Sequence, residues 1–300
     1  MFFDKVSIII PTYGGSNSLE RVVDSALSGQ DGDYDVIVVD DNNPDSEGRK
    51  KTERIMEKYI GMDSVIYLKH EKNKNGSAAR NTGANFSDSK YLCFIDDDDI
   101  VLPGRISKQK LFMDSHSEYK GSYCWCILDG KEVRNSEVGD LTKSLLDQSF
   151  SPQTSTWMID HEAFDSINGF DESYRRHQDY EFLLRFFKLY KFGVVKEVLL
   201  KRDKNEIDNQ LHGAKLVEMK KYFFDKFGYI VDEIDKKDIG YKKRVYAKHF
   251  ANTCFQLLKD RELKLAIETF NAYGRKGGLL FWKHFLKRIN VSIRNVLRHQ

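Results

Sequence analysis

Short runs of apolar residues alternate with amphipathic segments over the first two hundred positions of the chain. Four of these runs are rich in β-branched or aromatic side chains and predict strands: Val6–Ile10, Val36–Val39, Val65–Leu68 and Tyr91–Ile95. The segments between them predict helices over residues 19–27, 48–59 and 77–85. Strands that are apolar along their whole length and separated by helices indicate an α/β fold, with a mostly parallel sheet covered on both faces.

The pattern changes further along the chain. Shorter strands and loops lie between residues 121 and 160, followed by predicted helices at His161–Ile167 and Gln178–Tyr190 and a strand at Val194–Leu200. Beyond Arg202 the chain predicts helix throughout, in these stretches: Asn209–Phe227, Lys237–Leu258, Leu263–Tyr273 and Leu279–Leu297. We therefore expect a sheet domain over residues 1–203 and a helical region over residues 204–300.

The composition is that of a globular protein, but the charge is unevenly divided. Of 300 residues, 40% are hydrophobic and 31% are charged, which argues against disorder. Residues 1–200 carry 25 Lys and Arg against 34 Asp and Glu, whereas residues 201–300 carry 23 against 12. No acidic residue follows Glu268. This asymmetry indicates that the two regions meet different partners.

Several features indicate the cellular compartment. No apolar run approaches the ~20 residues of a membrane span, and the first residues lack the pattern of a signal peptide. The cysteines form neither a disulfide nor a zinc pattern, so we expect buried free thiols at Cys93, Cys124, Cys126 and Cys254. We expect the protein in the cytoplasm, free or peripheral at the inner face of the cell membrane.

Acidic side chains directly follow two of the predicted strands, where ligands bind in open parallel sheets. The tetrad Asp96–Asp99 follows the fourth strand, and Asp40-Asp41 follows the second. Adjacent carboxylates repel one another and need a compensating charge. Because no histidine or cysteine accompanies the tetrad, it favours a hard cation, Mg²⁺ or Mn²⁺. A solvated acidic turn or a helix cap is the alternative. His70, His161 and His177 share no ligand spacing, and we expect them at the surface or behind the site.

A series of motifs, in order and in spacing, resembles the bacterial family 2 glycosyltransferases. These are Val6-Ser-Ile-Ile-Ile-Pro-Thr-Tyr13, Val38-Val-Asp-Asp41, Gly76-x-x-Ala-Arg-Asn-x-Gly83, Phe94-Ile-Asp-Asp-Asp-Asp99-x-x-x-Pro103, Gly169-Phe-Asp-Glu172 and Gln178-Asp-Tyr-Glu-Phe-x-x-Arg185. The resemblance implies a GT-A fold for residues 1–203, a nucleotide-sugar donor, a divalent metal ion and inversion at the anomeric carbon.

The resemblance also implies roles for residues that hold the nucleotide sugar. Pro11, Tyr13 and Asp41 match positions that bind the base and ribose, with Asp41 facing a uracil imide. Arg80 matches a position near the nucleotide. Asp97 fills the variable place of the DxD element, where we expect it to touch ribose or the sugar.

The remaining matches concern the metal and the chemistry. Asp96 and Asp98 match the two aspartates of the DxD element, and Asp98 is the first choice as metal ligand. Asp179 matches the catalytic base, although a helix N-cap is its alternative role. The family motif has glutamate where this chain has Gln178, which leaves the role of that position open.

The resemblance implies a transferase that moves a sugar from a UDP-sugar onto a glycan or a lipid-linked glycan in surface-glycan synthesis. Two alternatives remain at this point. A sugar nucleotidyltransferase would need a basic loop after the first strand, and residues 12–17 contain no Lys or Arg. A non-catalytic module that binds nucleic acid through the basic tail would not need the acidic tetrad or Asp179.

The last predicted helix, Leu279–Leu297, combines apolar and basic positions at helical spacing. Its apolar residues are Trp282, Phe285, Leu286, Ile289, Ile293, Val296 and Leu297, and its basic residues include Lys283, Lys287 and Arg294, with Arg298 just beyond its end. Such a helix either lies on an anionic membrane surface or packs on its neighbours or on another subunit. The sequence leaves these readings open.

Overall fold

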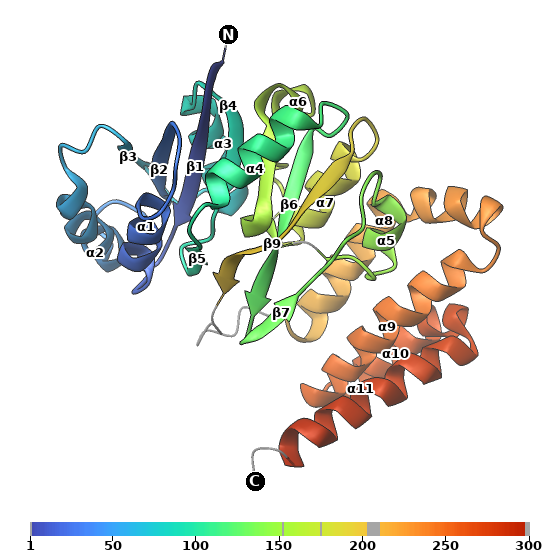
Figure 1. Ribbon diagram of the computed structural model, residues 1–300. Helices are drawn as coiled ribbons and strands as arrows, with labels where there is room; N and C mark the ends of the chain where they lie inside the picture. Colours follow the sequence, from blue (N-terminus) through green and yellow to red (C-terminus); the bar gives the residue numbers. More distant parts are fainter. Residues whose placement is uncertain (1, 152, 175, 203–210, 298–300) are drawn as a thin grey trace. The chain divides into compact units, whose positions relative to one another are not determined.

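A computed structural model describes the chain except for residues 1, 152, 175, 203–210 and 298–300. It separates into two compact units, Met1–Thr142 with Pro152–Glu206 and Lys143–Ser151 with Ile207–Gln300. We call them the sheet unit and the helical unit. The α/β fold and the helical C-terminal region predicted from the sequence are both confirmed (Figure 1).

The sheet unit is built on one mixed sheet of nine strands. The strands are β1 (Phe3–Thr12), β2 (Tyr34–Asp40), β3 (Val65–Lys69), β4 (Ser89–Phe94), β5 (Asp99–Val101), β6 (Gly121–Leu128), β7 (Lys131–Val133), β8 (Trp157–Asp160) and β9 (Phe192–Arg202). Their order is β3-β2-β1-β4-β8-β6-β9-β5, with β7 paired to β6. The first four strands pair in parallel, so their carboxyl ends meet at one edge of the sheet.

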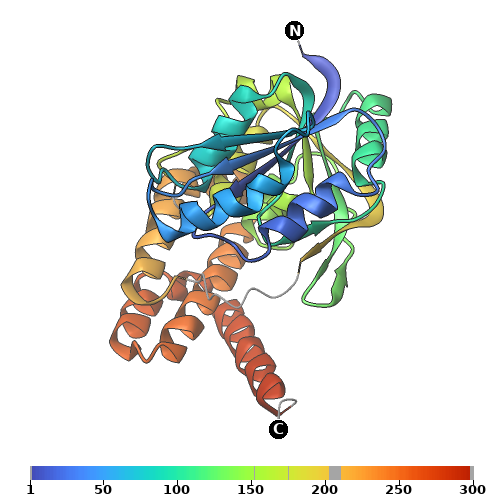
Figure 2. The same ribbon diagram turned by 90° about the vertical axis from the view of Figure 1, so that its left-hand side faces the viewer.

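Helices pack against the sheet because its central strands are apolar on both faces. In the sheet unit these are α1 (Leu19–Leu27), α2 (Glu47–Met56), α3 (Gly76–Phe86), α4 (Arg105–Ser115), α6 (His161–Ser166) and α7 (Gln178–Phe186), with short 3₁₀ turns η1 (Glu57–Tyr59) and η2 (Thr154–Thr156). The blue helices α1 and α2 lie beside the first strands in Figure 2.

Strand β1 shows how the two faces are filled. Ile8 and Ile10 belong to a buried cluster that includes Leu19 of α1. Ile9 points to the other face, where a Cβ added to Gly83 of α3 would stand 2.5 Å from its Cγ2 atom. Helix α3 can approach the sheet this closely because position 83 has no side chain. The close approach matters because α3 carries Arg80.

The helical unit contains α5 (Thr142–Leu146), α8 (Gly213–Lys237), α9 (Tyr241–Lys259), α10 (Leu263–Ala272), η3 (Gly274–Gly277) and α11 (Leu279–Leu297). Helix α9 is its centre, and α8, α10 and α11 pack on it. The sequence predicts a break between residues 227 and 237, but α8 runs through Gly228. It continues because Ile230 and Val231 extend its buried face. The predicted helix start at Asn209 lies outside the described residues.

The segment Lys143–Ser151 belongs to the helical unit although the chain on either side of it belongs to the sheet unit. Its backbone carbonyls explain why. The carbonyl of Lys143 accepts a hydrogen bond from the Tyr241 hydroxyl at 2.6 Å, and that of Gln148 accepts one from Lys248 Nζ at 2.7 Å. His249 Nε2 lies 2.8 Å from the carbonyl of Leu146. Helix α9 therefore holds a segment that precedes it by about a hundred residues.

Two predictions from composition can be compared with the structure. All four cysteines are free and buried, as expected. Among the described residues, no helix is both long enough and apolar enough to cross a bilayer.

The close packing at Gly83 of α3 and the open space at Gly228 of α8 predict opposite effects of a glycine-to-alanine substitution at these two positions. Gly83→Ala should lower the free energy of unfolding by about 1–3 kcal/mol, because the new methyl group overpacks Ile9. Gly228→Ala should raise it by up to about 1 kcal/mol, because alanine is the better helix former and nothing lies within 4 Å of the added Cβ. Urea unfolding followed by circular dichroism measures both. Equal effects at the two positions would contradict this packing.

Candidate functional site

The loops that follow β1, β2 and β4 are bonded to one another at the carboxyl edge of the sheet. The Asp41 N–H donates to the Thr12 carbonyl at 2.9 Å, and the Gly14 N–H donates to Asn42 Oδ1 at 2.8 Å. The Thr12 hydroxyl donates to the Asp97 carboxylate at 2.5 Å. Polar groups from three separate strands therefore form one site.

The acidic tetrad supplies a set of carboxylates that suits a cation. Asp96, Asp98 and Asp99 each have an oxygen within 4.8 Å of the others. Asp99 is only 1% exposed. Among the described residues neither of its oxygens has a partner within hydrogen-bond distance, although the Ser155 side chain still lowers its pKa. Arg202 supplies a positive charge, with its Nε 3.9 Å from Asp99 Oδ1. A buried carboxylate without hydrogen bonds is costly unless a cation joins it. The sequence places Asp99 in the acidic tetrad, but the family resemblance names only Asp96 and Asp98 as metal ligands.

The site raises the proton affinity of two members of the tetrad. Burial raises the pKa of Asp97 to about 7, against the lowering effect of the Thr12 hydroxyl. Burial, with the nearby charge of Asp96, raises the pKa of Asp99 to about 7 as well. Both groups are therefore poised to lose protons near neutral pH, and a bound cation would favour the ionised forms.

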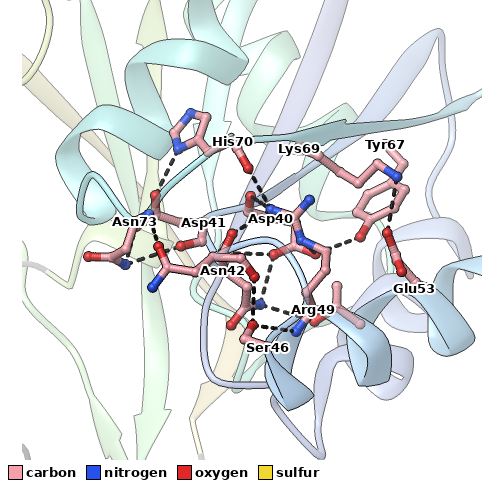
Figure 3. Close-up of polar contacts among 12 residues, drawn as sticks. Asp40, Asp41, Asn42, Ser46, Arg49, Glu53, Tyr67, Lys69, His70 and Asn73 are labelled. Atoms are coloured by element: carbon pink, nitrogen blue, oxygen red, sulfur yellow. Dashed lines mark hydrogen bonds and ion pairs between the residues drawn. The ribbon is translucent and has the colours of Figure 1, made fainter.

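Asp41 lies in a dense hydrogen-bond network (Figure 3). It is 3% exposed, and its carboxylate accepts bonds from the Asn73 side chain and from the backbone N–H groups of Lys74 and Asn75, all at 2.8–2.9 Å. The fourth contact is His70 Nδ1, at 2.7 Å. A carboxylate has about four lone-pair positions. Asp41 therefore holds the loop that leads into α3, and its contact with a uracil stays a prediction.

His70 was expected at the surface or behind the site, and the structure buries it behind Asp41. Its second ring nitrogen, Nε2, lies 2.8 Å from the Thr82 hydroxyl of α3. The ring thus links Asp41 to α3. A histidine two residues after a predicted strand was the only signal in the sequence, and it is too common to identify this role.

Asp40 has a different environment from Asp41. It is fully buried, accepts a hydrogen bond from the Tyr67 hydroxyl at 2.6 Å and pairs with Arg49 Nε at 3.0 Å (Figure 3). The Asn42 amide donates to it at 2.7 Å. Through these contacts, Asp40 holds the loop after β2 in place.

Arg80 connects the acidic tetrad to the start of α7. Its Nη2 donates to Asp96 Oδ1 at 2.6 Å, and its Nη1 donates to Gln178 Oε1 at 3.0 Å. The guanidinium carbon also lies 5.5 Å from the centre of the Phe170 ring, a cation–π distance. One side chain thus joins three motifs that are far apart in the sequence.

Gln178 uses both ends of its amide. The oxygen accepts from Arg80, and Nε2 donates to the Tyr174 carbonyl at 2.9 Å. A glutamate could accept the bond from Arg80 but could not donate to the carbonyl. Gln178, which stands where the family motif has glutamate, therefore keeps the link to Arg80 and also holds the preceding loop against α7.

Helix α3 also holds the loop before α7 through two asparagines. Asn75 caps α3 by accepting from the N–H groups of Ser77 and Ala78, while its amide donates to the Glu172 carbonyl at 2.8 Å. Asn81 exchanges two hydrogen bonds of 2.9 Å with the backbone of Phe170. The start of α7 is therefore positioned by α3.

Asp179 is the second residue of α7, and the N-cap of this helix is His177. The N-cap alternative for Asp179 is therefore wrong. Burial raises the pKa of Asp179, while the N–H of Tyr180 and the charge of Arg80 partly offset that effect. A carboxylate with a raised pKa is a stronger base near neutral pH than an ordinary aspartate.

The other predicted nucleotide contacts lie at the end of β1. Pro11 is half-buried in register with Val39, and Tyr13 is 61% exposed just beyond the strand. The structure brings Asp96 to Arg80 and Asp97 to Thr12. The Tyr13 backbone N–H also donates a hydrogen bond to the Asp97 carboxylate, which partly offsets the rise in the pKa of that group.

The chain resembles known proteins over most of the sheet unit. The family model described as Glycosyl transferase family 2 matches residues 7–199. An uncharacterized glycosyltransferase of Methanocaldococcus jannaschii is 28% identical over 229 residues, which cover 73% of this chain and 77% of that protein. The amylovoran biosynthesis glycosyltransferase AmsB of Erwinia amylovora is 32% identical over 209 residues, which cover 64% and 67%.

A solved structure supports the fold. Staphylococcus aureus TarS in complex with UDP-GlcNAc superposes with a TM-score of 0.60 and 19% identity, over 80% of this chain and 70% of that one. The likeness to this structure confirms the predicted GT-A fold.

The raised pKa values predict how stability depends on pH. Between about pH 4 and pH 7 folded Asp97 and Asp99 retain protons that the unfolded chain has lost, so stability falls as the pH rises, by up to about 1.4 kcal/mol per unit for each group. Asp97→Asn should flatten this slope and stabilise the metal-free protein at pH 8. The exposed control Asp63→Asn should not. Urea unfolding across this pH range measures the slope, and an unchanged slope for Asp97→Asn would contradict the assignment.

Proposed function

The chain belongs to glycosyl transferase family 2, and from this premise we propose that it transfers a sugar from a UDP-sugar to an acceptor hydroxyl, with inversion at the anomeric carbon. One observation carries the proposal: Arg80 joins Asp96 of the acidic tetrad to Gln178, the neighbour of Asp179. This contact supports a donor site at the tetrad and a base at Asp179 that lie next to each other. UDP as the nucleotide is supported by the TarS structure, which contains UDP-GlcNAc.

The nucleotide would lie over the carboxyl ends of β1 and β2. We assign Pro11, Tyr13 and Asp41 to the base and ribose. The exposed Tyr13 ring is free to stack on a base, because 61% of its surface is open. Asp41 acts by ordering the loop that precedes α3, and a uracil N–H would exchange for one of its four present bonds. Asp97 and Arg80 are assigned to the side of the site nearest the sugar and phosphates.

The metal would be Mn²⁺ or Mg²⁺, held by Asp96 and Asp98, to which the structure adds Asp99 as a candidate. The fit is supported by the buried Asp99 carboxylate, which has few polar partners, and by a cluster that consists of carboxylates alone among the described residues. When bound, such an ion stabilises negative charge on the departing diphosphate. Arg80 supplies a fixed positive charge beside the same cluster.

Asp179 is assigned as the general base. The acceptor hydroxyl attacks the anomeric carbon opposite the departing UDP, and its proton passes to the Asp179 carboxylate. The raised pKa of this group favours acceptance of the proton, and the Arg80 charge stabilises the carboxylate before the transfer. Gln178 is assigned a positioning role, because it holds Arg80 on one side and the Tyr174 carbonyl on the other.

The acceptor is proposed to be a glycan or lipid-linked glycan of the bacterial surface, such as a capsule, a teichoic acid or a glycoprotein glycan. The amylovoran biosynthesis protein AmsB, which matches this chain, supports a polysaccharide role. We place the reaction in the cytoplasm, at the inner face of the membrane.

The direct test is release of UDP from a panel of UDP-sugars in the presence of Mn²⁺. The proposal expects UDP from at least one sugar, with the rate raised by an acceptor glycan. Release of inorganic diphosphate from a nucleoside triphosphate and a sugar phosphate would instead identify a nucleotidyltransferase. Tight binding without turnover of any donor or acceptor would identify a binding module.

The metal assignment predicts that Asp98→Asn abolishes turnover and leaves the fold intact. UDP affinity of the wild type should rise when Mn²⁺ is added, and the variant should lose that rise but keep its metal-free affinity. Isothermal titration with and without Mn²⁺ measures the difference, with Asp63→Asn as control. Full wild-type activity in EDTA would refute the metal.

The base assignment predicts that Asp179→Asn lowers kcat by roughly 10²–10⁴ while the KM for the donor stays nearly unchanged. The wild-type rate should also fall as the pH drops through the raised pKa of Asp179, because the protonated carboxyl cannot accept a proton. Steady-state kinetics across pH measure both effects. A variant that lost UDP affinity and kept its turnover rate would show that Asp179 binds the donor instead.

A further inference from the structure

Helix α11 has a packed face and a free face. Phe281 is 2% exposed and stacks on Phe285, which also contacts the Phe255 ring of α9. Arg288, on the same side, donates to Asn252 of α9 at 2.7 Å. The sequence groups Phe285 with Trp282, Leu286 and Ile293 among the apolar positions of this helix. The structure separates them, because Phe285 packs beside Phe281 within the helical unit, whereas the other three side chains are about half exposed.

The free face carries large apolar side chains. Their exposed fractions are 85% for Leu279, 48% for Trp282, 55% for Leu286 and 51% for Ile293. Residues three, four and seven positions apart lie on one side of a helix, so these four form a single line. We call it the apolar stripe. It continues onto α10, because Trp282 contacts the Phe270 ring at 5.3 Å and Ile267 on that helix is 52% exposed.

A row of cations runs beside the apolar stripe. Lys283, Lys287 and Arg294 follow it at positions one residue later along the helix, and we call them the basic stripe. Residues 279–297 contain no aspartate or glutamate. Burial lowers the pKa of His284, and the positive charges of Lys248, Lys283 and Lys287 lower it further.

We propose that this face of α11 binds an anionic phospholipid surface, with the apolar stripe at the level of the acyl chains and the basic stripe among the headgroups. A helix with aromatic and aliphatic residues beside a purely basic face lies in this way in a membrane interface. In this arrangement α11 lies in the plane of the interface and does not cross the bilayer.

The charge of this face favours an anionic lipid surface over a second copy of the chain and over nucleic acid. A symmetric dimer through this face would bring one basic stripe close to the other, because such an interface pairs a surface with itself. Nucleic acid would satisfy the cations but would leave the exposed apolar side chains of Leu279 and Leu286 without a partner. An anionic membrane complements both stripes at once.

The expected binding is measurable. Each basic residue near an anionic surface strengthens binding about fivefold, so removal of the basic stripe should weaken it by at least about a hundredfold. Trp282 reports insertion, because its emission shifts to shorter wavelength when its ring leaves water. The other two tryptophans, Trp125 and Trp157, are part-buried or buried in the sheet unit.

The experiment is flotation of the full chain with vesicles of phosphatidylcholine and phosphatidylglycerol, and with vesicles of phosphatidylcholine alone. The wild type should float with the anionic vesicles at low salt and show the emission shift. The basic-stripe variant K283E/K287E/R294E should not float, and L286Q/I293Q should float poorly. The matched control K215E/K221E/K236E changes three exposed lysines of α8 and should float like the wild type. W282F should float but lose the shift.

Three results would overturn the proposal. The wild type would fail to float with anionic vesicles, or the α8 control would lose binding as fully as the basic-stripe variant. Alternatively, sedimentation would reveal a dimer that L286Q/I293Q dissociates, which would assign the face to a second copy. Circular dichroism confirms that each variant is folded. Because the readout is binding, a failure here leaves the proposed sugar transfer untouched.

Discussion

The ion pair between Arg80 and Asp96 is the contact on which the candidate site depends. It is 2.6 Å long, and the same guanidinium reaches Gln178 at 3.0 Å. Without it, the carboxylates of four adjacent aspartates at the end of a buried strand would repel one another, with little positive charge nearby to offset the repulsion. Arginine suits this position because its planar group donates in two directions at once. The acidic loop and the start of α7 are thereby held by one side chain.

The position of Arg80 depends in turn on how α3 meets the sheet. Gly83 allows the helix to sit directly on Ile9, and Asn75 caps its first turn. His70 ties the same helix to Asp41 through Thr82. The polar network at the carboxyl edge therefore rests on an apolar contact beneath it. This explains how buried carboxylates with raised pKa values are retained, since a rigid, well-packed scaffold offsets their cost.

The sequence predicted the parts of the fold that depend on local pattern. The first four strands and α3 appear where apolar runs and helical spacing placed them, and the motif resemblance identified the GT-A fold. It did not predict that Asp99 is buried with few polar partners or that His70 supports Asp41, because both depend on contacts between distant segments. The helix break expected before residue 237 was wrong, since burial of Ile230 and Val231 outweighs the local effect of Gly228. The role of Gln178 became clear only once Arg80 and Tyr174 were placed around it.

The most direct test of the account is a double-mutant cycle between Arg80 and Gln178, measured as kcat/KM for sugar transfer. Arg80→Met and Gln178→Met each remove one side of the contact. If Arg80 acts through its link to the start of α7, the double variant will lose less than the two single losses combined, with a coupling of about 0.5–3 kcal/mol. Strictly additive losses would contradict the account, because they would mean that the acidic loop and α7 act independently.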